Sequence, residues 1–393
     1  MKKQVSVEEL QFGVFIAELD RPWTETPFVF QGFIFNTEQQ RETLKKFCKK
    51  VYIDTEKGAD LADKGRPGAG GAQVSVLATI KEKVAYQEKA SIKAEAPVAR
   101  AAHAKTAVVL KDVLSTVQAG KALDAPRVKE AVTSMTDSVV RNPDAMLLLT
   151  KMREKSEHTL DRALGVSIYM ITFGRFLQLP REQLDLLGML GLLQDVGKVR
   201  MPQELLQKKE PLSEAERKIC CSHVEHSVAV LKETQGLPAE LPALAALHHE
   251  RYDGTGYPRG LKGGAIGLFG GIAGLVDCFD ALTHPRPYGE TLAPSNALNM
   301  LYGWRNAQFD GPLIEQFIHC VGIFPVGALV ELYSGEVGIV IAQNPMMRLM
   351  PRVMVALDAR GKPVKPQKIV DRASIKRTLE KGSVPLDTSE FFL

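Results

Sequence analysis

Helical periodicity between Pro143 and about Arg305 is the feature that most limits how this 393-residue chain can fold. Apolar residues recur there at every third or fourth position, the pattern of helices that bury one face. The stretches are residues 144–179, 183–195, 213–233, 240–250 and 271–283. Ser213 and Glu216 have the spacing of a capping box, which predicts that a helix begins there. The sequence therefore predicts a mainly α fold with a bundle of helices as its core.

Smaller β-structures are expected on both sides of this region. Residues 1–55 predict a small β-rich domain with one helix at residues 41–50. Its strand-like runs are residues 5–10, 13–19, 28–35 and 51–55. Residues 327–342 predict a β-hairpin with a Ser-Gly turn. The predicted helical domain thus spans residues 143–345, and residues 346–393 form a C-terminal extension.

Residues 56–142 are interpreted as a linker followed by connecting helices. Residues 56–73 are rich in Gly, Ala and Pro, which is typical of a linker. Helical spacing then appears at residues 76–93 and 107–123. Two interpretations stay open: these helices pack on a partner, or they form a partly mobile helical linker.

Composition narrows the class of protein. The chain is 45% hydrophobic and 24% charged, as in soluble globular proteins. Its net charge of +4 is small for this length and gives no case for DNA binding. The N-terminus has no apolar run of a signal peptide, and no stretch approaches the roughly 20 apolar residues of a spanning helix. The five cysteines lack CxxC spacing, which favours reduced thiols. We therefore expect a cytoplasmic protein without membrane insertion.

Histidines and carboxylates gather in the helical region. The candidate ligands are His158, Asp195, His223, His226, His248, His249, Asp277 and Asp280. Imidazole together with carboxylate suits Fe, Mn or Zn better than Mg or Ca. Neighbouring residues in a helix point about 100° apart, so the pair His248–His249 can hold one ion only at a helix end. Each histidine alone is more often a surface or core group, as we expect for His103, His284 and His319.

Several motifs resemble the HD-GYP subgroup of the HD phosphohydrolases, a bacterial family. They are QDVGKVRMP (194–202), HHERYDGTGYPRGL (248–261), VDCFDALTHPRPY (276–288) and VGIFPVGALVEL (321–332). LDRPWTETPFVFQGF (19–33) resembles the small domain that often precedes HD-GYP domains. The resemblance implies an HD-type helical bundle over roughly residues 143–342.

The resemblance also implies an activity and a set of site residues. Family members hydrolyse cyclic di-GMP with two or three ions, usually Fe or Mn, that activate a bridging water. By position, Asp195 would bridge the metals and Lys198 would hydrogen-bond the phosphate or the water. His223, His248 and His249 would complete the shell of one ion, and Asp277 would serve the other. Tyr257 and Arg286 would contact the dinucleotide, the latter through its phosphate.

Two positions depart from the family pattern, and both belong to the second ion. Gln194 stands where the signature histidine is expected, and Arg162 stands at the position of an earlier ligand histidine. Arginine is permanently cationic and cannot ligate a metal. We expect it to pair with Asp277 or Asp195 in place of the lost charge. His158, one helical turn before Arg162, could supply a nitrogen instead.

These departures lead to competing functional expectations. The preferred one is a degenerate HD-GYP protein that binds cyclic di-GMP or a diguanylate cyclase domain with weak or no hydrolysis. The alternative is an active phosphodiesterase, with one or two ions, that gives linear pGpG or GMP. A general nucleotide phosphohydrolase fits the GYP motif less well. We also expect a homodimer. Asp280 is expected either to support the metal ligands from behind or to lie on the helix surface. His226 is not expected to be a ligand.

Overall fold

The structure is a computed structural model that describes residues 2–21, 26, 32–35, 38–55, 75–150, 158–208, 210–284, 291–344, 347, 349–379 and 383–384. The chain divides into two compact units. One comprises Met1–Ala72, Gly322–Pro325 and Leu329–Leu379, and the other comprises Gln73–Val321, Val326–Ala328 and Glu380–Leu393. The first unit holds two small sheets, and the second is helical. Each is described by itself.

The N-terminal sheet is antiparallel, with the strand order β1-β4-β2-β3. Its elements are β1 (Lys2–Ser6), η1 (Val7–Glu9), β2 (Phe15–Leu19), β3 (Phe33–Ile34), α1 (Glu38–Phe47) and β4 (Lys50–Asp54). A core that includes Ile16, Leu44 and Ile53 lies between α1 and the sheet. The expected strand at residues 5–10 is wrong after Ser6, where Ser6 caps a 3-10 turn. Part of the strand expected at residues 28–35 lies outside the described residues.

The C-terminal sheet has five strands in the order β8-β7-β6-β5-β9. They are β5 (Leu329–Leu332), β6 (Val337–Ala342), β7 (Arg352–Leu357), β8 (Pro363–Val370) and β9 (Ile375–Thr378). The predicted hairpin is present as β5 and β6, which pair antiparallel. Gly335 turns the chain with a φ of +84°, a conformation that favours glycine. The other three strands come from residues for which the sequence predicted no strands.

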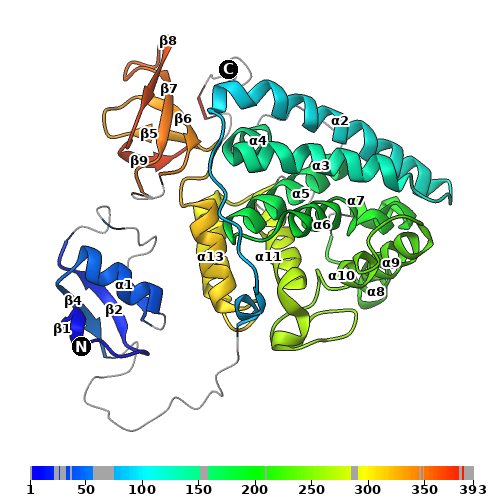
Figure 1. The fold of residues 1–393 in the computed structure, drawn as a ribbon, viewed down its shortest axis with the longest axis horizontal. Helices are drawn as coiled ribbons and strands as arrows, with labels where there is room; N and C mark the ends of the chain where they lie inside the picture. Colours follow the sequence, from blue (N-terminus) through cyan, green and yellow to red (C-terminus); the bar gives the residue numbers. More distant parts are fainter. Residues whose placement is uncertain are drawn as a thin grey trace. The chain divides into compact units, whose positions relative to one another are not determined.

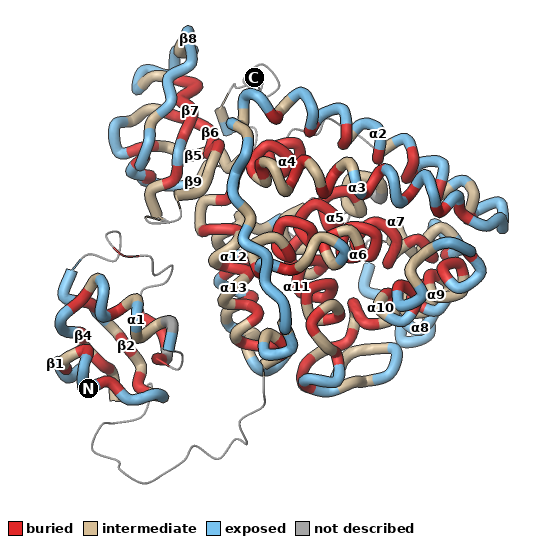
Figure 2. Tube along the Cα trace, viewed as in Figure 1, coloured by how far each residue is buried: buried red, intermediate tan, exposed pale blue. Residues whose placement is uncertain are grey.

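The second unit is built from helices, and the predicted mainly α fold is confirmed. Its elements are η3 (Val76–Thr79), α2 (Ile92–Gln118), α3 (Ala125–Arg141), α4 (Pro143–Leu149), α5 (His158–Phe176), α6 (Arg181–Leu193), η4 (Val196–Arg200), α7 (Gln203–Gln207), α8 (Glu214–Cys221), α9 (His223–Glu233), α10 (Leu241–Ala245), η5 (Gly263–Ile266), α11 (Gly267–Thr283), α12 (Pro294–Gly303) and α13 (Gly311–Val321). Helix α5 packs against both α6 and α11. Buried residues concentrate along these three helices, which form the core (Figure 2).

Helices α2 and α3 run side by side and pack against the rest of the helical unit (Figure 1). The helix expected at residues 76–93 is wrong between residues 80 and 91. That segment is instead held extended by tertiary hydrogen bonds: Val84 N–H donates to Gln178 O at 2.7 Å and Lys89 N–H donates to Arg141 O at 3.0 Å. The hydroxyl of Tyr86 donates to Leu179 O at 2.8 Å. These bonds satisfy the backbone without a helix.

One stretch of the described chain, Gly263–Thr283, is long and apolar enough to cross a membrane. The expectation that no stretch approaches this length is therefore wrong. Sixty-one per cent of its most apolar 18 residues is buried inside the protein. The reason is that α11 is a core helix that packs against α5, α6 and α13. Length and composition alone do not separate such a core helix from a membrane span.

Candidate metal centre

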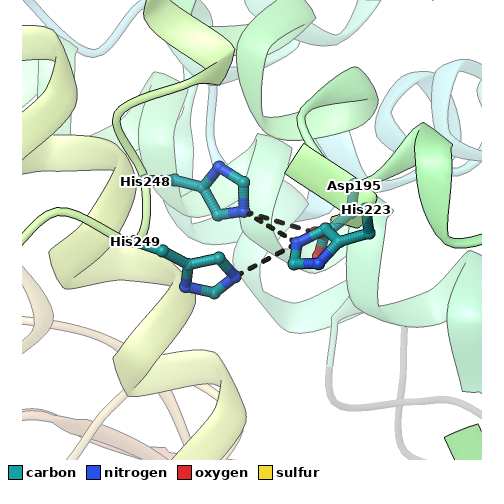
Figure 3. Close-up of side chains that lie close together, drawn as sticks. All are labelled: Asp195, His223, His248 and His249. Atoms are coloured by element: carbon teal, nitrogen blue, oxygen red, sulfur yellow. Dashed lines mark hydrogen bonds and ion pairs between the residues drawn. The ribbon is translucent and has the colours of Figure 1, made fainter. Parts of the chain in front are cut away.

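Four side chains from successive helix ends meet at one point. Asp195 follows the end of α6 and precedes η4, and His223 is the first residue of α9. His248 and His249 come shortly after α10, which ends at Ala245. Each side chain thus sits where a helix begins or ends, which lets adjacent His248 and His249 point to the same place. Figure 3 shows the four side chains converging.

The distances in this cluster are those of groups around a shared centre. One ligand atom from each residue lies within 4.8 Å of the others. Oδ1 of Asp195 is 3.2 Å from Nε2 of His223 and 3.4 Å from Nε2 of His248. Nε2 of His249 lies 3.2 Å from Nε2 of His223. His223 and His248 are 3% and 0% exposed, so little water competes at this point.

Backbone carbonyls fix which nitrogen of two imidazoles faces inward. Nδ1 of His223 donates to Cys220 O at 2.7 Å, and Nδ1 of His248 donates to Ala245 O at 2.7 Å. A carbonyl oxygen only accepts, so Nδ1 of each ring carries a proton, and in the neutral tautomer the lone pair is on Nε2, which faces Asp195 Oδ1. Burial, reinforced by neighbouring His248, lowers the pKa of His249 well below its usual value and keeps that ring neutral. Lone pairs therefore converge with a carboxylate, the arrangement that a metal cation satisfies.

Gly197 allows η4 to lie directly on α9. A Cβ at this position would be 2.3 Å from His223 O and 2.4 Å from Ser227 N. The Gly197 N–H donates to Ser227 Oγ at 2.8 Å. Because only glycine permits this approach, it brings Asp195 and His223 together.

Lys198 belongs to the same turn, and its ammonium donates to Asp195 Oδ2 at 2.6 Å. Burial alone would raise the pKa of Asp195, but the ammonium of Lys198 holds it well below its usual value. Asp195 is therefore ionised, with Oδ2 on Lys198 and Oδ1 facing the histidines. A carboxylate in this state can ligate a metal.

The loop at residues 250–262, which we call the GYP loop, lies beside the cluster. The buried carboxylate of Glu250 accepts the Arg259 and Leu261 N–H groups, both at 2.8 Å. The ring of Tyr257 stacks on His249 with centroids 4.7 Å apart, and its N–H donates to His249 O at 3.1 Å. Burial, and then contact with the Cys221 thiol, raises the pKa of Tyr257, so its hydroxyl stays protonated. Glu250 thereby holds the loop that carries Tyr257.

A second charged cluster joins α5 to α11. Nη2 of Arg162 donates to Asp277 Oδ1 at 2.7 Å, and its Nε lies 3.4 Å from Asp280 Oδ2. The side chains of Asp277 and Asp280 are 6% and 0% exposed. Nδ1 of His284 is 3.0 Å from Asp280 Oδ1. The negative charge of Asp277, against the opposing effect of burial and with help from Asp195 and Asp280, raises the pKa of Arg162.

The predicted site residues thus fall into three groups. Asp195, Lys198, His223, His248 and His249 lie together with Tyr257. Asp277 lies instead in the ion pair with Arg162. Arg286 and the side chain of His158 lie outside the described residues. The surface position considered for Asp280 is wrong, because its side chain is fully buried.

Two residues that contribute to the site, Glu250 and His284, were not predicted from the sequence. Glu250 follows the histidine pair directly and precedes a glycine-rich loop, so a carboxylate that caps the loop's N–H groups was a recognisable option. His284 has the helical i+4 spacing from Asp280, but nothing in the sequence indicated that Asp280 is buried.

Comparisons with known proteins identify the family of the chain. A model described as the HD domain matches residues 145–313, and a domain of unknown function, DUF3391, matches residues 2–128. The chain is 33% identical over 378 residues to the cyclic di-GMP phosphodiesterase PA4108 of Pseudomonas aeruginosa, covering 94% of this chain and 89% of that protein. The chain belongs to the HD-GYP family.

Two further similarities cover shorter parts of the chain. The chain is 38% identical over 143 residues to the cyclic di-GMP phosphodiesterase response regulator RpfG of Xanthomonas campestris, covering 36% of this chain and 38% of that protein. It is 34% identical over 157 residues to the 3'3'-cGAMP-specific phosphodiesterase 1 of Vibrio cholerae, covering 40% of this chain and 36% of that protein. The chain thus spans little more than a third of these two relatives.

HD phosphohydrolases are metal-dependent, and the residues of this HD-GYP protein fit one ion. The first cluster supplies a carboxylate and three imidazoles, a donor set suited to Fe, Mn or Zn. The second position offers no such set among the described residues. Asp277 Oδ1 accepts from Arg162. Gln194, which stands where the signature histidine was expected, is 1% exposed, and neither of its amide atoms has a hydrogen-bond partner within the part of the chain that the structure describes. An amide oxygen is a weak ligand for these metals, and a guanidinium is none.

Proposed function

We propose that this HD-GYP protein binds cyclic di-GMP at a centre for one Fe or Mn ion and hydrolyses it weakly or not at all. One observation carries the proposal: a four-ligand cluster lies beside a second position whose carboxylate is engaged by Arg162. The relatives' names point to cyclic dinucleotides, and 3'3'-cGAMP is therefore the second ligand to test.

The charges at the two positions support binding of a phosphodiester. Asp195, Asp277 and Asp280 carry three negative charges, and Arg162 and Lys198 carry two positive charges. If the histidines are neutral, these five groups leave a net charge of −1, so a divalent ion would make it +1. A net positive, largely buried centre attracts a ligand whose phosphates are each singly negative.

Weak hydrolysis follows from the number of metal ions that the centre can hold. A bound divalent ion would acidify a water and counter charge on the phosphate. In a two-ion clamp, the attacking and the leaving oxygen are stabilised separately, and removing one such stabilising group typically costs about 10²–10³ in rate. Here the described side chains complete one ion's shell only. Lys198, held on Asp195, would remain to orient the phosphate or the water.

The alternative is an active phosphodiesterase that gives linear pGpG or GMP. It is favoured by the Lys198–Asp195 pair at 2.6 Å, because both residues of this pair are present beside the three histidines of the cluster. Binding of a diguanylate cyclase domain, a homodimer and a cytoplasmic location stay predictions from the sequence.

The test is a binding and cleavage assay on the full chain, loaded anaerobically with Fe²⁺ or with Mn²⁺. Radiolabelled cyclic di-GMP and 3'3'-cGAMP are followed by equilibrium dialysis and by chromatography of products. We expect saturable binding of a cyclic dinucleotide with less than one turnover per site during the assay. His249→Ala, which removes one ligand but leaves Arg162 in place, is the matched control. Steady multiple turnover that this variant abolishes would establish the alternative.

A further inference from the structure

We infer that Arg162 is a built-in second cation: its guanidinium takes the charge role of a second metal ion and limits the centre to one ion per chain. The inference rests on the proposed metal centre, but it does not depend on whether a dinucleotide is turned over. It concerns the role of an arginine at a position where the family pattern has a metal-ligand histidine.

The geometry shows a guanidinium enclosed by carboxylates. Arg162 comes from α5, and Asp277 and Asp280 lie three residues apart on one face of α11. Two different nitrogens of the guanidinium meet two different carboxylates, at 2.7 Å and 3.4 Å. The Arg162 side chain is itself only 22% exposed. A planar cation with several N–H donors suits this double pairing.

Charge balance explains why a cation is needed. Two carboxylates as buried as Asp277 and Asp280 are costly unless a positive charge compensates them. Arg162 pairs with both of them, and His284 pairs with Asp280. Arginine keeps its charge at every relevant pH and at every metal concentration. The compensation is therefore permanent, whereas a metal ion would supply it only when bound.

The same contacts oppose binding of a second ion. A divalent ion on Asp277 Oδ1 would compete with the Arg162 N–H group that donates there at 2.7 Å. It would also lie beside a fixed positive charge in a largely buried place, where repulsion between like charges is weakly screened. Gln194 adds a neutral amide instead of an imidazole. Raising the metal concentration should consequently not fill this position.

The experiment is metal counting on the full chain, by mass spectrometry after equilibration with saturating Mn²⁺ and removal of free metal. Wild type is expected to hold about one ion per chain. The double variant Arg162→His with Gln194→His, which restores two imidazoles, is expected to hold about two. Arg162→Lys keeps the charge and should stay at one. Arg175→His is the matched control, because Arg175 lies on the same helix but donates to Val140 O and lies over the Tyr86 ring, and neither partner is a candidate metal ligand.

Electron paramagnetic resonance gives an independent reading. Wild type should show the spectrum of an isolated Mn²⁺ ion, and the double variant should show two magnetically coupled ions, since paired sites lie about 4 Å apart. Two ions per wild-type chain would overturn the inference even if the double variant failed to fold. A folded double variant that still bound one ion would also overturn it. One ion with steady turnover would refute the weak hydrolysis of the proposed function but not this inference. Two ions without turnover would refute this inference, and with it the one-ion centre, but not the weak hydrolysis.

Discussion

Replacing Gly197 by alanine tests whether the contact between η4 and α9 builds the metal centre. The new Cβ would lie 2.3 Å from His223 O and 2.4 Å from Ser227 N, against 3.4–4 Å for ordinary contacts. Overpacking costs about 1–3 kcal/mol, and the upper end applies because both obstacles are backbone atoms. Losing the Gly197–Ser227 hydrogen bond adds about 1 kcal/mol, and the lower chain entropy of alanine returns about the same. The expected loss of stability is therefore about 3 kcal/mol.

Amide hydrogen exchange of peptides from α6 and α9 measures this loss locally, without assuming that the two compact units unfold together. Metal affinity should fall as well, because Asp195 and His223 move apart. Gly264→Ala is the matched control, since a Cβ there meets nothing within 4 Å. Unchanged exchange and unchanged metal content in Gly197→Ala, equal to those of the control, would refute the proposed role of this contact.

Other perturbations probe the metal, the GYP loop and a capping box. Chelating the metal should lower the melting temperature of wild type but not of His223→Ala. A bound metal ion stabilises the folded protein by about 2.7 kcal/mol when free metal is at a hundredfold excess over its Kd. Equal shifts of the melting temperature in both proteins would contradict the assignment of His223 as a ligand. Glu250→Gln should weaken cyclic di-GMP binding about tenfold, because the variant loses a charged hydrogen bond to the GYP loop and so loosens the loop around Tyr257. Its metal content should stay that of wild type. Loss of metal would argue against a role confined to the loop. The hydrogen bond from Lys208 lowers the pKa of Glu216 to about 2, so Glu216 stabilises α8 above about pH 4.5 and loses this effect as pH falls toward its folded pKa. The melting difference between wild type and Glu216→Gln should therefore vanish toward pH 2, and a difference constant with pH would contradict this reasoning.

The sequence predicted those parts of the fold that local patterns determine. The capping box at Ser213 and the hairpin around Gly335 are present, because both depend on residues close in sequence. The segment at residues 80–91 was mispredicted, because bonds to Gln178 and Arg141 decide its conformation. The apolar length of α11 was overlooked, and only packing shows that it is a core helix.

At the site, too, sequence motifs predicted part of the arrangement, and contacts between distant residues determined the rest. The motifs indicated that Asp195, His223, His248 and His249 belong together, and the structure brings them within 4.8 Å. The sequence left open whether Arg162 pairs with Asp277 or with Asp195, since these residues are far apart in the chain. The structure places its hydrogen bond on Asp277 and adds Asp280, a buried partner whose depth no local pattern reveals.

Anomalous diffraction from a crystal of the full chain grown with Mn²⁺ tests the central claim most directly. The claim is that this HD-GYP protein has a centre for one ion, with Arg162 in place of the second. The account predicts one anomalous peak, between Asp195 and the three histidines His223, His248 and His249. It also predicts an intact Arg162–Asp277 pair. A second peak bound to Asp277, with Arg162 displaced, would contradict it.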